Sequence, residues 1–157
     1  MAHSDQIKAR ALTIANIGED DSAAYETLTK DILDLAAQRM EDELGPTEWT
    51  TYVDLIQNTT YDPTVEYYTY TDDQKKLNTL EKAESFFALF YLVPALKLIA
   101  KGNVLEDKFS TGSAGSARDV LPSDMQEIFR SQAMYERSAL QLIDGISTSY
   151  STTIMVV

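Results

Sequence analysis

The chain has 157 residues, of which 44% are hydrophobic and 24% are charged, which suits one globular domain with a core of its own. Its formal net charge of -12 disfavours binding to nucleic acid or to an anionic membrane, because no stripe of Lys and Arg overcomes the repulsion. The absence of cysteine excludes disulfides, thiolate metal sites and cysteine nucleophiles. The first residues lead into a polar segment, so we expect no secretory signal and synthesis in the cytoplasm.

The N-terminal half of the sequence has the spacing of amphipathic helices. A short helix is expected over 5–16, ended by Gly18. A longer helix is expected at roughly 22–44, because apolar residues recur there at helical spacing until Gly45-Pro46 stops them. Pro46 suits the first turn of a third, shorter helix that reaches Ile56.

The middle of the chain begins with a turn-rich segment, and 64–70 is expected to be a loop or a short β segment because its Val, Thr and Tyr residues favour extended backbone. Thr71 and Gln74 then form the pattern of a capping box. The helix that follows is the most apolar part of the sequence and should be surrounded by protein. We expect Pro94 to kink it and Lys101-Gly102 to end it.

The C-terminal part is predicted to contain a loop over 103–121, with its Gly/Ser-rich core at 110–117, and a last helix from Pro122 to Gly145. The final segment, 146–157, has no charged side chain and many β-branched residues, so an extended tail is expected. The predicted fold is mainly α: a small helical bundle at 1–145 with a long apolar central helix, followed by the tail at 146–157.

No convincing catalytic or metal-binding motif is found, and no cofactor is expected. His3 is the only histidine, which argues against a di-iron site and against a serine hydrolase that needs a histidine base. The glycine-containing segment 112–118 could in principle bind a phosphate through its backbone N–H groups. It lacks the Gly-Lys-Ser/Thr ending of a P-loop, so this interpretation is weak. A magnesium-dependent hydrolase built from carboxylates alone is a third option, but the acidic clusters lie where helix ends already favour negative charge.

Two segments are better suited to binding protein. The tyrosine-rich region is flanked by acidic residues, so its aromatic side chains are expected either to form an interface or to pack over the apolar helix. The residues expected at a subunit interface are Tyr67, Tyr68, Tyr70 and Phe109. The tail is expected either to be disordered or to add a strand to a partner. Its partner-binding residues would be Tyr150, Thr152, Ile154, Met155 and Val156.

The order of these features resembles the head–tail connector, or adaptor, proteins of tailed bacteriophages. The resemblance rests on a short first helix followed by Gly18-Glu19-Asp20-Asp21-Ser22, the helix end Met40-Glu41-Asp42-Glu43-Leu44-Gly45, the aromatic run Ala83-Glu84-Ser85-Phe86-Phe87-Ala88-Leu89, the Gly/Ser loop, and the last helix with its tail. It covers most of the chain but includes no diagnostic motif. The tyrosine-rich insertion at 58–70 departs from the family.

The resemblance implies a non-enzymatic virion protein at the head–tail junction, forming a dodecameric ring that contacts the portal protein on one side and a tail or stopper protein on the other. DNA would pass through its channel without specific binding, and an acidic lining would favour this. The residues expected to line the channel are Glu19, Asp20, Asp21, Glu41, Asp42 and Glu43. The alternative is a small helical binding module or regulatory subunit unrelated to virions.

Overall fold

The computed structural model describes residues 2–17, 22–110 and 122–154, and for 22–24, 96–110, 122–124 and 148–154 it describes the backbone only. This part of the chain contains α1 (His3–Ile14), α2 (Ser22–Thr27), α3 (Lys30–Asn58), a short 3-10 helix η1 (Tyr67–Thr69), α4 (Asp72–Ser110) and α5 (Pro122–Ile154), and no strand. The prediction of a mainly α bundle with a long apolar central helix is confirmed.

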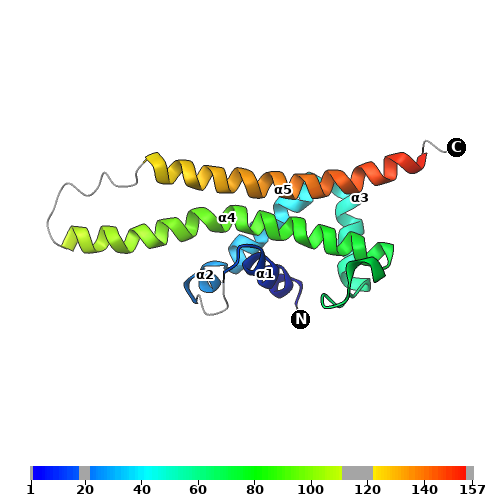
Figure 1. The fold of residues 1–157 in the computed structure, drawn as a ribbon, viewed down its shortest axis with the longest axis horizontal. Helices are drawn as coiled ribbons and strands as arrows, with labels where there is room; N and C mark the ends of the chain where they lie inside the picture. Colours follow the sequence, from blue (N-terminus) through cyan, green and yellow to red (C-terminus); the bar gives the residue numbers. More distant parts are fainter. Residues whose placement is uncertain (1, 18–21, 111–121, 155–157) are drawn as a thin grey trace.

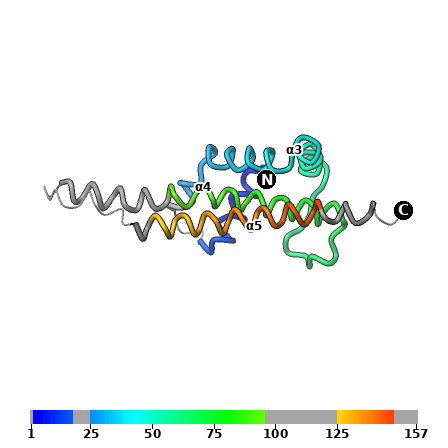
Figure 2. Tube along the Cα trace, turned by 90° about the horizontal axis from the view of Figure 1, so that it is seen from above, coloured from blue at the N-terminus to red at the C-terminus, as the bar shows by residue number. Residues whose placement is uncertain are grey.

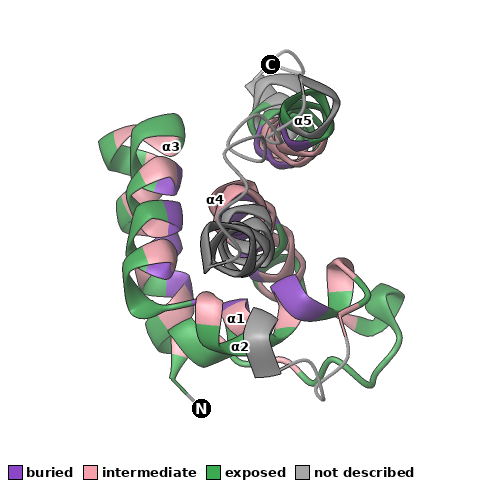
Figure 3. Cartoon of the chain, turned by 90° about the vertical axis from the view of Figure 1, so that its left-hand side faces the viewer, coloured by how far each residue is buried: buried purple, intermediate pink, exposed green. Residues whose placement is uncertain are grey.

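The central helix of the bundle is α4. It packs against α5 on one side and against α1, α2 and α3 on its other sides (Figures 1 and 3). Its apolar stripe is fully buried at Leu80, Phe87 and Leu92. The inner faces of α1 and α3 contribute Ile7 and Met40, which are also buried. Burying such side chains from several helices against one central helix is what holds the bundle together.

The two longest helices, α4 and α5, run antiparallel and side by side (Figures 1 and 2). Residues of α5 that face the core are spaced alternately by four and three: Ile128, Gln132, Tyr135, Ala139, Leu142 and Ile146. This spacing keeps one face of a helix against a long neighbour. The Gln132 amide also donates a hydrogen bond of 3.1 Å to the Phe90 carbonyl oxygen, which links the two helices.

A sharp bend at Gly45 divides α3 into two halves that point in different directions (Figure 2). Gly45 has φ 74° and ψ 170°, a backbone conformation that only glycine adopts readily because it has no Cβ. Pro46 follows in the first turn of the second half, where its missing N–H is tolerated. The predicted break at Gly45-Pro46 is therefore confirmed. The bend positions Tyr52 and Leu55 of the second half in the core.

Replacing Gly45 with alanine is expected to lower the free energy of unfolding by about 1–3 kcal/mol, because alanine is strained at this φ and ψ. Gly145 provides a matched control, since it lies inside α5 and has no atom within 4 Å of an added Cβ. Gly145→Ala should instead raise stability by about 0.5–1 kcal/mol. Urea unfolding of both variants measures the difference, and equal effects at the two positions would contradict the backbone argument.

The N-terminus of α4 confirms the predicted capping box. The Thr71 amide donates to Gln74 Oε1 at 2.9 Å, and the Gln74 amide donates to Thr71 Oγ1 at 3.3 Å. The Gln74 side chain also donates to the Thr60 carbonyl oxygen at 2.8 Å. The Gln74 side chain therefore accepts a hydrogen bond from a backbone N–H at the start of α4, and it also fixes the preceding loop to the helix.

Of the two alternatives expected for 64–70, a loop or a short β segment, the β segment is not confirmed, because Tyr67–Thr69 forms a 3-10 turn. The segment satisfies its hydrogen bonds locally instead of with a neighbouring strand. Asp62 accepts hydrogen bonds from the amide and the hydroxyl of Thr64, at 2.9 and 2.6 Å. The Tyr70 hydroxyl donates to the Asp62 carbonyl oxygen at 2.7 Å. The turn-forming aspartate therefore outweighs the strand propensity of the tyrosines.

Several predicted helix ends differ from the structure. The expected helix at 22–44 is interrupted before Lys30, because fully buried Leu28 separates α2 from α3 and Thr29 has extended backbone. Lys101-Gly102 does not end α4, which contains Pro94 and continues to Ser110, so 103–110 of the predicted loop are helical. The remainder of that loop, 111–121, lies outside the described residues.

The extended tail at 146–157 is not confirmed, because α5 passes through Gly145 and continues to Ile154. Leu142 and Ile146 both pack against the core on either side of Gly145, so the stripe that holds the helix in place crosses the expected stop. A glycine inside a helix costs only about 1 kcal/mol, which this packing offsets. No change of secondary structure marks the predicted boundary at 145, and residues 155–157 lie outside the described part.

Candidate functional site

The described residues among those predicted to bind partners lie in four places: α3, the segment before α4, α4 itself and α5. Tyr67 and Tyr68 are exposed, whereas Tyr70 is half-buried and its ring lies 5.3 Å from that of Tyr61. The acidic side chains of 41–43 are exposed on α3. Glu19, Asp20, Asp21, Met155 and Val156 lie outside the described residues. The backbone of Phe109 lies in α4, and the backbones of Tyr150, Thr152 and Ile154 lie in α5, but their side chains are not described.

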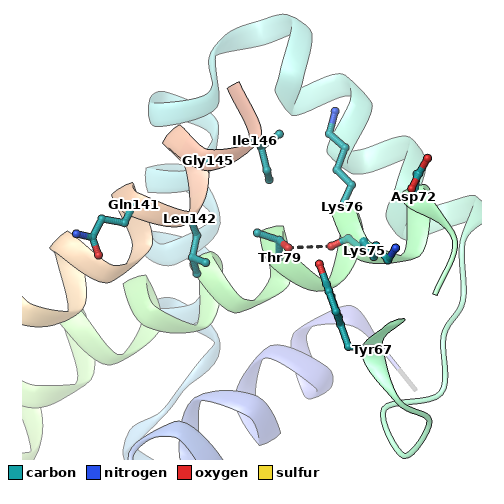
Figure 4. Close-up of a pocket in the computed structure, with 9 residues that line it drawn as sticks. All are labelled: Tyr67, Asp72, Lys75, Lys76, Thr79, Gln141, Leu142, Gly145 and Ile146. Carbon is teal, nitrogen blue, oxygen red and sulfur yellow. Dashed lines mark hydrogen bonds between the residues drawn. The ribbon is translucent and has the colours of Figure 1, made fainter. Parts of the chain in front are cut away.

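A groove of about 390 Å³ brings two of the predicted binding segments together. It lies between the N-terminal part of α4 and the C-terminal part of α5 (Figure 4), and its walls include Tyr67 and Ile146. Lys75 and Lys76 line it from α4, and the Lys75 ammonium lies 5.9 Å from the centre of the Tyr67 ring. Ile146 is the first residue of the predicted tail. The groove therefore connects the start of that segment to 59–71, the segment between α3 and α4 that we call the tyrosine-rich loop.

The most concentrated chemistry is a buried polar cluster where α1, α3, α4 and the tyrosine-rich loop meet. We call it the polar cluster, and it consists of His3, Arg10, Tyr52, Tyr61, Glu81 and Glu84. Glu81 and Glu84 lie on the buried face of α4 and are each only 3% exposed. Two carboxylates in the core require partners, since burying an unpaired charge is costly.

Glu84 is held by two of these partners. Its Oε2 atom accepts a hydrogen bond from the Tyr52 hydroxyl at 2.5 Å and contacts His3 Nε2 at 2.9 Å. The Tyr52 side chain is fully buried, and the His3 ring packs against it edge to face, with ring centres 5.9 Å apart. One carboxylate oxygen therefore joins the first residue of α1 to the second half of α3.

Glu81 is the centre of the other half of the polar cluster. Its Oε2 atom accepts a hydrogen bond from the Tyr61 hydroxyl, which in turn accepts one from Arg10. Arg10 is fixed further by Asn78, since its Nη1 donates to the Asn78 carbonyl oxygen at 2.9 Å and to Oδ1 at 2.8 Å. The other oxygen, Glu81 Oε1, lies 3.7 Å from His3 Nδ1, which has no hydrogen-bond partner among the described residues.

The electrostatics of the polar cluster favour charged His3 and neutral tyrosines. Burial opposes a charge on His3, but its contacts with Glu81 and Glu84 outweigh this and raise its pKa from 6.5 to about 9. Burial, together with Glu84, raises the pKa of Tyr52 well above its ordinary value, and burial with Glu81 raises that of Tyr61. Two basic side chains thus balance two carboxylates, while both phenols remain hydrogen-bond donors.

The polar cluster should make stability depend on pH through His3. Because its pKa is higher in the folded protein than the ordinary 6.5, its contribution is complete below about pH 6.5 and is lost as pH rises through about 9. The partial exposure of His3 limits this contribution to about 1–2 kcal/mol. Urea unfolding of wild type and His3→Gln at about pH 6.5 and about pH 9.5 should show the gap between them shrinking, whereas a constant gap would contradict the assignment.

The geometry of the polar cluster suits a structural role better than catalysis. The hydroxyl of Tyr52 and both carboxylates are buried and already engaged with one another. The two ring nitrogens of His3 face different glutamates, and within the described residues no group of three His, Cys, Asp or Glu side chains is arranged to hold a metal ion. The cluster can therefore fix α1 and the tyrosine-rich loop to α4.

Sequence reasoning missed the polar cluster although signals for it were present. His3, Ile7 and Arg10 are spaced by four and three, so they lie on one face of α1. Glu81 and Glu84 interrupt the apolar stripe of α4 at positions that should face the core. A single histidine near the start of α1 does not by itself indicate buried carboxylate partners, because Glu81 and Glu84 lie about 80 residues further along the chain.

The fold and the polar cluster define a helical protein organised around a long antiparallel helix pair, in which the polar side chains of the cluster mainly bind one another. No protein-family model, curated protein or solved structure matches the chain. In the described part of the chain no helix is both long and apolar enough to cross a membrane.

Proposed function

We propose that this protein is a structural, non-enzymatic adaptor of a tailed-bacteriophage virion. It forms a ring at the head–tail junction, joins the portal protein to a tail or stopper protein, and lets DNA pass through a channel without specific binding. The sequence resemblance suggests this role and a dodecameric ring. The net charge of -12 is compatible with it, since an acidic wall does not retain DNA.

The observation that carries the proposal is the outer side of α5. This helix packs against α4 and scarcely touches α3, and it leaves the large apolar side chains Phe129 and Met134 58% and 55% exposed. A terminal helix that is covered on one side only, with large apolar residues elsewhere on its surface, provides area for a second polypeptide.

The second surface needed for a ring is provided by the tyrosine-rich loop. A closed ring of identical subunits requires two different patches on each copy, one at each neighbour. Tyr67 and Tyr68 are 53% and 76% exposed on this loop, and amphipathic tyrosines are favoured at interfaces. In our proposal the α5 surface of one copy contacts the tyrosine-rich loop of the next.

The portal-binding role is assigned to the end of the chain. Residues 148–157 contain no charged side chain, whereas Ile146 packs against the core of its own subunit. A helix that frays or extends at its end can reach across a large interface when it binds a partner. The uncharged composition favours insertion into an apolar groove or against the edge of a sheet.

Removing residues 148–157 is expected to leave the fold intact while abolishing joining to the portal. The truncation retains Ile146 and every core side chain that the structure describes, so the free energy of unfolding should change by less than about 0.5 kcal/mol. Infection with a virus carrying the truncation should give filled heads without tails. Normal particles would contradict the assignment, and a control in which residues 148–157 are moved to a carrier protein should show whether the segment binds alone.

A further inference from the structure

A pocket of about 520 Å³ lies beside the polar cluster, between α1, the tyrosine-rich loop and α4. Its volume falls within the range of small-molecule sites, about 300–1,000 Å³. The apolar part of its wall is supplied by Ala9, Ile14, Pro63 and the Tyr61 ring. Its polar lining consists of Arg10 and Glu81, which we call the floor of the pocket, and of the side chains of Gln6 and Thr13. Mostly apolar walls with a few fixed polar groups are typical of ligand sites.

The floor of the pocket retains hydrogen-bond donors. Arg10 makes three hydrogen bonds to described residues, two to Asn78 and one to Tyr61. A guanidinium has five N–H groups, so two make no hydrogen bond to a described residue. One of these is on Nη2, which lies 3.8 Å from Glu81 Oε2, so the Nε–H is the donor left for an acceptor on a ligand. Because Asn78 and Tyr61 already fix its orientation, Arg10 loses little freedom when a ligand binds.

The charge at the floor selects against ions. Arg10 lies 3.8 Å from Glu81, and Glu81 is 3% exposed. A carboxylate ligand would be attracted by the Arg10 guanidinium but repelled by the nearby Glu81 carboxylate. A cationic ligand would be attracted by Glu81 but repelled by Arg10. The pocket is therefore best matched by a ligand with no net charge.

We infer that this pocket binds an uncharged, mainly apolar small molecule that carries one carbonyl or hydroxyl oxygen. The apolar body lies against Ala9, Ile14 and Pro63, and the oxygen accepts a hydrogen bond from Arg10. The inference does not depend on the proposed adaptor function, because every residue it uses belongs to a single copy of the chain.

Three matched probes test the inference with the full chain: 2-acetylnaphthalene, 2-ethylnaphthalene and 2-naphthoate. They differ chiefly in the group presented to Arg10, which is a carbonyl, a hydrocarbon or a carboxylate. Titrations followed by NMR of the backbone amides should give saturable shifts at Gln6, Ala9 and Thr13. The ketone is expected to bind about five-fold more tightly than the hydrocarbon and about ten-fold more tightly than the carboxylate.

A matched pair of variants locates the binding. Thr13 lines the pocket, whereas Thr50 lies on the exposed side of α3, and each hydroxyl donates to the carbonyl oxygen four residues earlier, at 2.9 Å. Thr13→Trp should weaken binding of the ketone at least about ten-fold by filling the pocket, and Thr50→Trp should not change it. Absence of saturable shifts, equal effects of the two substitutions, or tighter binding of 2-naphthoate than of the ketone would overturn the inference.

Discussion

Replacing Glu84 with alanine is expected to lower the free energy of unfolding by about 3–5 kcal/mol. The substitution removes the acceptor shared by Tyr52 and His3, which lie 2.5 and 2.9 Å from Glu84 Oε2. The fully buried Tyr52 hydroxyl would lose its acceptor and keep only a 3.4 Å contact with His3 Nε2, while His3 would lose one of the two carboxylates that favour its charge. This loss is a large fraction of the stability of a single domain, which is about 5–15 kcal/mol.

Urea unfolding of three further variants shows whether this loss comes from the polar cluster. Glu84→Gln retains a side-chain oxygen that can accept from Tyr52 and should cost less than Glu84→Ala. Glu41→Ala removes an exposed glutamate and should change stability by less than about 0.5 kcal/mol. A double-mutant cycle between Glu84→Ala and Tyr52→Phe should give a coupling of about 1 kcal/mol or more. If Glu84→Ala and Glu41→Ala lowered the free energy of unfolding equally, that would contradict the claim that the polar cluster fixes α1, α3 and α4 to one another.

Introducing aspartate at both Phe129 and Met134 is expected to abolish ring assembly. Both side chains are more than half exposed, so the fold of one copy should tolerate the change. At an interface each aspartate would be buried without a partner, which together should weaken association by at least about 100-fold. Native mass spectrometry of the assembly should then show single copies. The control Leu35→Asp changes an apolar side chain on α3 that is 44% exposed and should leave the ring intact.

The proposed contact between α5 of one copy and the tyrosine-rich loop of the next makes a sharper prediction for mixtures of two variants. A Tyr67→Asp/Tyr68→Asp variant should also fail to form rings, since it lacks the opposite patch. In a mixture with the Phe129→Asp/Met134→Asp variant, the tyrosine variant still has an intact α5 surface. The Phe129→Asp/Met134→Asp variant still has an intact tyrosine-rich loop. Such mixtures should contain pairs with one copy of each variant and nothing larger. Complete recovery of rings, or no pairing at all, would contradict contact between α5 and the tyrosine-rich loop.

Much of the bundle could be predicted from helical spacing and end signals. The break at Gly45 and the box formed by Thr71 and Gln74 depend on neighbouring residues only, so local chemistry determines them. Helix ends that depend on tertiary packing were predicted wrongly. Gly145 would end an isolated helix, but packing at Leu142 and Ile146 carries α5 across it. The tyrosines at 67–70 favour a strand, yet no partner strand lies among the described residues.

The polar cluster could be predicted only in part, because its two halves are far apart in the sequence. Spacing alone places Glu81 and Glu84 on the buried face of α4, and it places His3 and Arg10 on one face of α1. Their pairing depends on α1 lying against α4, which no local pattern specifies. Tyr52 joins them only because Gly45 bends α3 toward the core. Charged residues on an apolar stripe were the available sign that such partners exist.

Electron microscopy of the assembly that contains the full-length chain in its native source tests the central claim most directly. An affinity-tagged copy isolates the assembly, and class averages reveal how the subunits are arranged around it. The adaptor account predicts a closed ring around a channel, with the portal on one side and tail components on the other. Single copies or pairs of this chain bound to a complex without a portal would contradict it and would support a helical binding module.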